Sequence, residues 1–135
     1  MKINWDQSPV TGTWTVLGDE SDRTQTIRNY KPRRRSLVQT TPMFQAENQQ
    51  IAPLLNKIWT LSFDVERTHA SLDAALAFQY THPAGLPDFI TLQIIQGTTT
   101  LYLVTAVLTE FDIVPEGVSS VSSYALTGIY TNVAP

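Results

Sequence analysis

The sequence contains no cysteine and few charged residues, and both absences narrow the classes of protein to which it can belong. Without cysteine, neither a disulfide framework nor thiolate chemistry is possible. Charged residues make up 16% of the chain, against about 25% in typical soluble domains. Threonine, serine, glutamine and asparagine take their place. We therefore expect one domain of 135 residues with a surface suited to protein contacts.

Long apolar runs are also missing. The first seven residues carry no apolar segment of the kind that marks a secretory signal. No apolar run approaches the roughly 18 residues that a membrane-spanning helix needs. We therefore expect no membrane partner.

Motifs for catalysis and cofactor binding are absent as well. The chain has no G-x-G-x-x-G, no phosphate loop, no G-x-S-x-G and only two histidines. The one metal-like pattern is D-x-E-x-x-H, formed by Asp64, Glu66 and His69. The commoner explanation is that Asp64 and Glu66 form the solvent-facing half of an amphipathic strand. We expect no enzyme, no metal, no cofactor and no small-molecule substrate.

The clearest pattern is a strand followed by a helix. Over residues 59–66, apolar and polar residues alternate, which predicts a strand with one buried and one wet face. A helix is predicted over residues 71–81. Ser71 is a favourable N-cap residue, and Pro83 should end the helix because it disfavours helical geometry in the residue before it.

Further β patterns follow. Residues 89–95 and 101–108 predict a hairpin around Gly97, with Tyr102, Val104, Ala106 and Leu108 on one face and a bulge near Glu110. The predicted fold is mainly β: an antiparallel β-sandwich or partly closed barrel with one short helix at one opening. Within one domain, 1–135, we expect an N-terminal arm at 1–12, a long irregular loop or ribbon at 18–56 and a β core at 57–131.

Charge is unevenly distributed along the chain. Residues 1–35 hold seven Lys/Arg and four Asp/Glu, whereas residues 36–135 hold two and eight. A basic arm beside an acidic body predicts contact with a partner, including another copy of the chain. The predicted oligomer-contact residues are Arg28, Tyr30, Arg33, Arg34 and Arg35, and the predicted exposed acidic face is Asp64 and Glu66. A solvated loop and a nucleic-acid patch are the alternatives for the basic cluster.

The order of elements resembles the tail-tube fold of bacteriophage tails and contractile injection systems, including distal tail proteins. The matching features are a strand at 59–66, an Ala-rich helix at 71–80, two strands within 89–113, a Ser-rich stretch at 116–123 and a last strand ending in Leu126-Thr-Gly128. The resemblance implies a virion structural protein that forms homo-oligomeric, commonly hexameric, rings. Its partners would be itself and other tail proteins, and DNA would pass through without specific binding. Its location would be the phage tail, assembled in the bacterial cytoplasm.

The sequence also allows a second hypothesis. A small, monomeric β-sandwich could bind a carbohydrate or another surface ligand through exposed tryptophans. Trp5 and Trp14 are the candidates, whereas Trp59 belongs to the predicted buried face of its strand.

Overall fold

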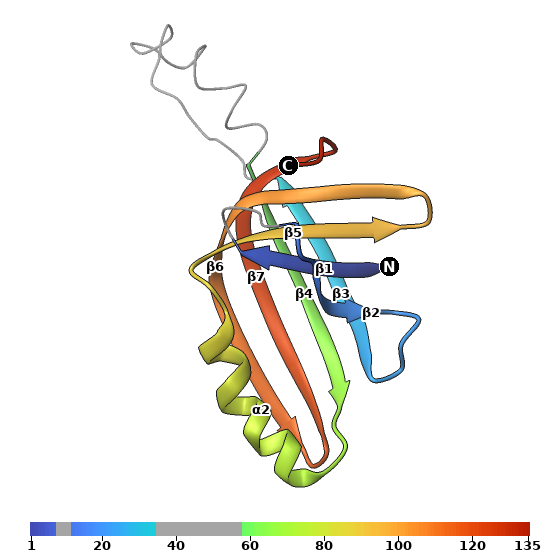
Figure 1. The fold of residues 1–135 in the computed structure, drawn as a ribbon, viewed down its shortest axis with the longest axis vertical. Helices are drawn as coiled ribbons and strands as arrows, with labels where there is room; N and C mark the ends of the chain where they lie inside the picture. The colour runs from blue at the N-terminus through green and yellow to red at the C-terminus, as the bar shows by residue number, and fades with distance from the viewer. Residues whose placement is uncertain (8–11, 35–57) are drawn as a thin grey trace, which may run out of the picture.

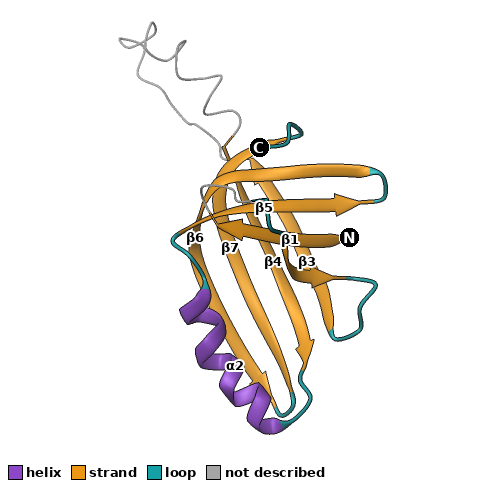
Figure 2. Cartoon of the chain, viewed as in Figure 1, coloured by secondary structure: helices purple, strands orange, loops and turns teal. Residues whose placement is uncertain are grey.

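A computed structural model describes residues 1–7, 12–34 and 58–135. It is mainly β, as predicted, with one α-helix in the described part of the chain (Figures 1 and 2). The elements are β1 (Lys2–Gln7), β2 (Thr15–Asp19), β3 (Gln25–Arg34), β4 (Ile58–Thr68), α2 (Leu72–Gly85), β5 (Phe89–Gln96), β6 (Thr99–Glu116) and β7 (Ser119–Thr131).

The seven strands form one sheet in the order β2-β1-β5-β6-β7-β4-β3, and every neighbouring pair is antiparallel. The sheet curls into a half-barrel, so that β1 and β5 cross in front of the long strands β7 and β4 (Figure 1). The predicted partly closed barrel with one helix is therefore confirmed. Helix α2 lies beside β6 at one end of the sheet (Figure 1).

The core lies inside this curl. In β4, Leu61, Phe63 and Val65 are buried, and the residues between them are partly exposed. This confirms the predicted alternation. β4 pairs in register with β7, which places Phe63 opposite Tyr124 with their rings stacked at 5.1 Å. The inner faces of β1, β2, β3, β5 and β6 complete the core with Ile3, Leu17, Ile27, Ile90, Leu92, Ile94, Leu103 and Ala106.

Strand β6 bends where its register shifts, between Val104 and Val107 (Figure 1). Thr105 has a positive φ of 47° there. An extra residue in one strand reverses the side chains that follow, because faces alternate with a period of two. Leu103 is fully buried whereas Val104 is not, so the predicted common face of Tyr102, Val104, Ala106 and Leu108 was wrong. The bulge expected near Glu110 is present.

Helix α2 begins as predicted. The Ser71 hydroxyl accepts a hydrogen bond from the Ala74 amide at 3.1 Å. The predicted end at residue 81 was wrong, because the helix continues through Pro83 to Gly85. Pro83 supplies no amide hydrogen to the last turn, and the stacking of His82 on Phe78 helps to hold the preceding residue in helical geometry.

The N-terminal third is more regular than expected. The arm predicted at 1–12 contains β1, which lies inside the sheet between β2 and β5. The loop or ribbon predicted at 18–56 contains β3, an edge strand paired with β4. The part of that prediction covering residues 35–56 lies outside the described residues, as does Lys57 at the start of the predicted β core. Pro32 is tolerated in β3 because edge strands have a side that needs no donor.

Gly128 offers a test of the packing between β7 and the bend in β6. A Cβ at this position would lie 2.8 Å from the Val104 carbonyl oxygen and 2.9 Å from the Ala106 Cα. We expect Gly128→Ala to lower the free energy of unfolding by about 1–3 kcal/mol, as overpacking does. Gly85→Ala is the matched control, because nothing lies within 4 Å of that position. Chemical denaturation of both variants measures the difference, and equal stabilities would contradict the packing argument.

Candidate functional site

Arg67 continues the buried face of β4 and closes one end of the half-barrel. It is buried, and its guanidinium donates hydrogen bonds to the Leu17 carbonyl oxygen at 2.8 Å and to the Ser122 hydroxyl at 3.0 Å. Leu17 belongs to β2, at one end of the sheet, whereas β4 adjoins β3 at the other. The guanidinium also lies over the rings of Phe78 and Tyr124. One side chain therefore connects both ends of the sheet with the helix.

A cluster of rings fixes α2 on the sheet. The His82 Nε2 lies 2.5 Å from the Tyr124 hydroxyl oxygen, and the His82 ring stacks on Phe78 at 4.6 Å and approaches Phe111 at 5.7 Å. Burial lowers the pKa of His82 from 6.5 to about 4, and the nearby Arg67 charge contributes further. The His82 Nε2 has a partner on the sheet and the ring stacks within the cluster, so the cluster attaches the helix to the sheet.

The metal-like pattern does not form a site. Asp64 and Glu66 lie on the outer face of β4, where Asp64 accepts a hydrogen bond from the Asn29 side chain at 2.7 Å and Glu66 pairs with Arg28. His69 follows the end of the strand, and its Nε2 lies 2.9 Å from the Ser120 hydroxyl oxygen. Among the described residues, no group of three histidines or carboxylates is placed to hold a metal ion.

The predicted oligomer-contact residues lie on β3, an edge strand. Arg28, Arg33 and Arg34 are exposed there. Tyr30 is half-buried, and its hydroxyl lies 3.3 Å from that of Tyr130 in β7. Its side chain therefore packs against the core and is not free on the edge. Arg35 lies outside the described residues. The strand therefore presents a row of cations along an edge that carries no neighbouring strand in the described structure.

Besides the terminal strands β3 and β2, the far half of β6 also lacks a paired strand on one side, which the sequence did not reveal. Strand β5 pairs with β6 only as far as Phe89 opposite Val107. Beyond that point, through Glu116, β7 is the one described strand that pairs with β6, and α2 lies beside this half (Figure 1). Glu110, Asp112 and Glu116 are exposed along this half. We name it the β6 edge. It carries acids where the β3 edge carries bases.

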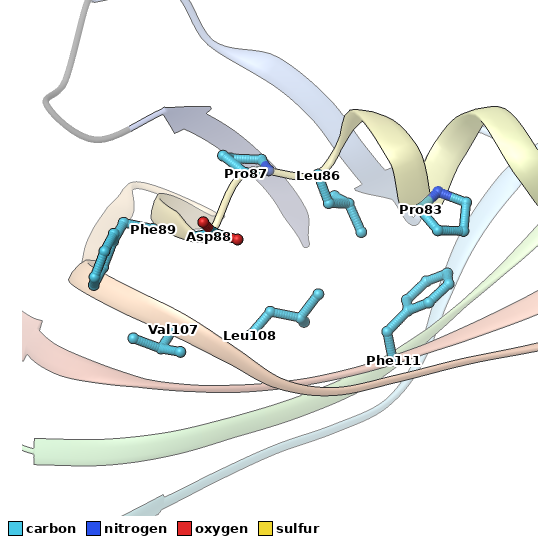
Figure 3. A pocket seen from close by; sticks show the side chains of 8 residues that line it. All are labelled: Pro83, Leu86, Pro87, Asp88, Phe89, Val107, Leu108 and Phe111. Atoms are coloured by element: carbon cyan, nitrogen blue, oxygen red, sulfur yellow. The ribbon is translucent and has the colours of Figure 1, made fainter.

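An apolar groove of about 450 Å³ opens where the β6 edge begins. Leu86 and Pro83 from the end of α2 and Leu108 and Phe111 from β6 line it (Figure 3). Asp88, which precedes β5, and Phe89, its first residue, stand at the opposite end of the groove. Phe89 is 56% exposed. An apolar groove thus adjoins the acidic edge.

The tryptophans do not form a flat binding platform. Trp5 packs against the core, and Trp59 stacks on Tyr130 at 5.0 Å. Trp14 is tilted by 41° against Tyr102 at 6.2 Å. Nothing in this arrangement favours a carbohydrate over another ligand.

No family model, no curated protein and no solved structure matches this chain. Within the described ranges, no helix is both long and apolar enough to cross a membrane.

Removing the cation at Arg67 tests its role in closing the half-barrel. Arg67→Met keeps an unbranched apolar side chain but leaves the Leu17 carbonyl and the Ser122 hydroxyl without their donor. We expect the free energy of unfolding to fall by roughly 2–4 kcal/mol. Arg28→Met removes an exposed ion pair and should cost less than about 1 kcal/mol. Urea denaturation compares the two, and similar losses would refute this role.

The buried histidine predicts that acid destabilises the fold. Because the pKa of His82 is about 4 in the folded chain and near 6.5 in the unfolded chain, only the unfolded chain takes up the proton between these values. Stability should therefore be full above pH 6.5 and fall by roughly 1–2 kcal/mol towards pH 4, allowing for partial exposure. In His82→Phe this part of the slope should disappear. Thermal denaturation gives the melting temperature of both proteins between pH 6.5 and 4.5. If it fell equally with pH in the wild type and in His82→Phe, His82 would not be the group responsible.

Proposed function

We propose that this chain is a structural, non-catalytic protein whose copies assemble side by side into rings through their sheet edges. The observation that carries the proposal is that β3 and the far half of β6, beside α2, each lack a described strand on one side and carry opposite charges, basic along β3 and acidic along β6. Open edges carry unpaired backbone groups that can pair with another chain. Two different edges that fit each other make a head-to-tail contact, which closes into a ring when the rotation allows.

Strand direction supports this contact. Between the two edges lie β3, β4, β7 and β6, four strands that alternate in direction. With an even number of strands and rotational symmetry, the β3 of one copy runs antiparallel to the β6 of the next. The joined sheet would therefore continue the antiparallel pattern without interruption.

The charges also lie at matching heights along the strands. The pairing register places Arg28, Asp64, Ser123 and Asp112 in one row across the sheet. The next row runs from Lys31 through Ser62 and Ala125 to Glu110. When two copies stand at the same height, Arg28 faces Asp112 and Lys31 faces Glu110 across the joint. Opposite charges on neighbouring strands stabilise a sheet.

The resemblance to tail-tube proteins extends this proposal to a location. Such rings would stack into, or cap, a tail conduit of a phage or prophage virion, contacting other tail proteins and assembling in the bacterial cytoplasm. The outer face of β4, with Thr60, Ser62, Asp64 and Glu66, would then be available to line the conduit. A lining of carboxylates and hydroxyls would let DNA pass without specific binding, because carboxylates repel phosphates.

Exchanging the charges of the two edges tests the assembly. Arg28→Glu with Lys31→Glu, or Glu110→Lys with Asp112→Lys, should raise the protein concentration needed for rings at least roughly tenfold. The reason is that each lost attraction contributes up to about 1 kcal/mol and 1.4 kcal/mol is a factor of ten. Combining all four changes should restore assembly. Light scattering after size exclusion and electron microscopy provide the measurement.

The control is Lys2→Glu with Arg23→Glu, a double charge reversal away from both edges, which should leave assembly unchanged. A wild-type chain that stays monomeric at high concentration and shows no rings by microscopy would overturn the proposed function. If the edge reversals and the control reversal had equal effects on assembly, the two edges would not be the surfaces that mediate it.

A further inference from the structure

We infer that the groove at the start of the β6 edge receives the segment Pro32-Arg33-Arg34 from the β3 of a second copy. The inference rests on the proposed ring and adds one docking site between neighbouring copies, which we call the seat. In this seat, Arg33 lies on the ring of Phe89 and Arg34 pairs with the carboxylate of Asp88.

The groove lies where a docked strand must leave the sheet. An incoming β3 can pair with β6 only beyond Val107, because β5 already occupies the same side of β6 from Thr99 to Val107. Phe89, opposite Val107, therefore blocks its path. The docked chain has to turn away beside Asp88 and Phe89, at the mouth of the groove (Figure 3).

Proline suits this turning point. The register puts Pro32, Leu61, Leu126 and Leu108 in one row, so in a second copy at the same height Pro32 arrives beside Leu108, which lines the groove. Proline has no amide hydrogen, so its strand can stop pairing there without leaving a donor unsatisfied. Its ring is apolar and matches the groove wall.

The two residues after Pro32 match the two at the groove's far end. Arg33 shares the outer face of the sheet with Lys31, and Phe89 is exposed. An arginine over an exposed aromatic ring contributes a cation–π attraction. Arg34 has the opposite orientation, and Asp88 is an exposed carboxylate in the groove lining. Arginine pairs with a carboxylate through two parallel hydrogen bonds.

Charge also selects a second copy as the occupant. The groove adjoins Glu110 and Asp112 and contains Asp88, so its occupant should combine cations with a small apolar group. In the described residues, exposed cations adjoin a proline only in β3, at Lys31, Arg33 and Arg34. That segment already lies at the edge proposed to meet β6.

Disulfide trapping tests the seat directly, because the chain contains no cysteine of its own. Two single variants, Arg34→Cys and Asp88→Cys, carry different tags and are assembled together under mild oxidation. We expect a disulfide-linked dimer containing both tags, several-fold more abundant than in a mixture of Arg34→Cys with Glu116→Cys. Glu116 lies on the same edge but at its far end. Each variant alone should give little crosslinked product, because the contact joins two different surfaces.

A second measurement tests the proposed contact between Arg33 and the ring of Phe89. Phe89→Ala should weaken ring assembly without changing the melting temperature, because the ring is exposed in the single chain. Rings that form normally, with the Asp88 mixture crosslinking no better than the Glu116 control, would overturn the seat and leave the proposed function intact. A wild-type chain that never assembles would overturn both.

Discussion

The hydrogen bond from the Arg67 guanidinium to the Leu17 carbonyl holds the two ends of the sheet together, and the curl of the half-barrel depends on it. Strand order alone places β2 and β4 far apart. Gly18 of β2 comes so near to Ile27 of β3 that a Cβ on Gly18 would lie 2.7 Å from the Ile27 side chain. The two ends therefore meet at this point without forming a ladder. A buried cation costs desolvation energy, which the two hydrogen bonds and two aromatic faces offset.

The contact between Arg67 and Leu17 joins the sheet at one point only. The rest of β3 and the far half of β6 therefore carry no further described strand. β2 touches β3 near Ile27 without forming a ladder, and β5 leaves β6 at Val107 to join the helix. The bulge around Thr105 bends β6, and β5 remains paired with β6 only as far as Val107, just beyond the bulge. The core and the open edges therefore share one cause: a sheet that turns a corner instead of closing around itself.

Much of this fold could be predicted from local periodicity, and little of the site could. The alternation over residues 59–66 gave both faces of β4, and Ser71 marked the start of α2. Thr105 was not predictable, since its positive φ depends on the corner in which it sits. Arg67 continues the every-second-residue pattern of Leu61, Phe63 and Val65, and this spacing indicated a buried position. Its charge, however, argued for exposure. The acidic β6 edge requires knowing where β5 stops, and no local pattern contains that information.

In the proposed assembly, the charges on the two edges would oppose pairing of like edges and favour pairing of unlike edges. Charged side chains and proline on an edge strand oppose indiscriminate pairing. Two β3 edges repel each other through Lys31, Arg33 and Arg34, and two β6 edges repel each other through Glu110 and Asp112. Only the contact between unlike edges is attractive, and such a contact is head-to-tail, so it cannot close as a symmetric dimer. The same residues that would oppose indiscriminate edge pairing would thus direct the proposed assembly towards a ring.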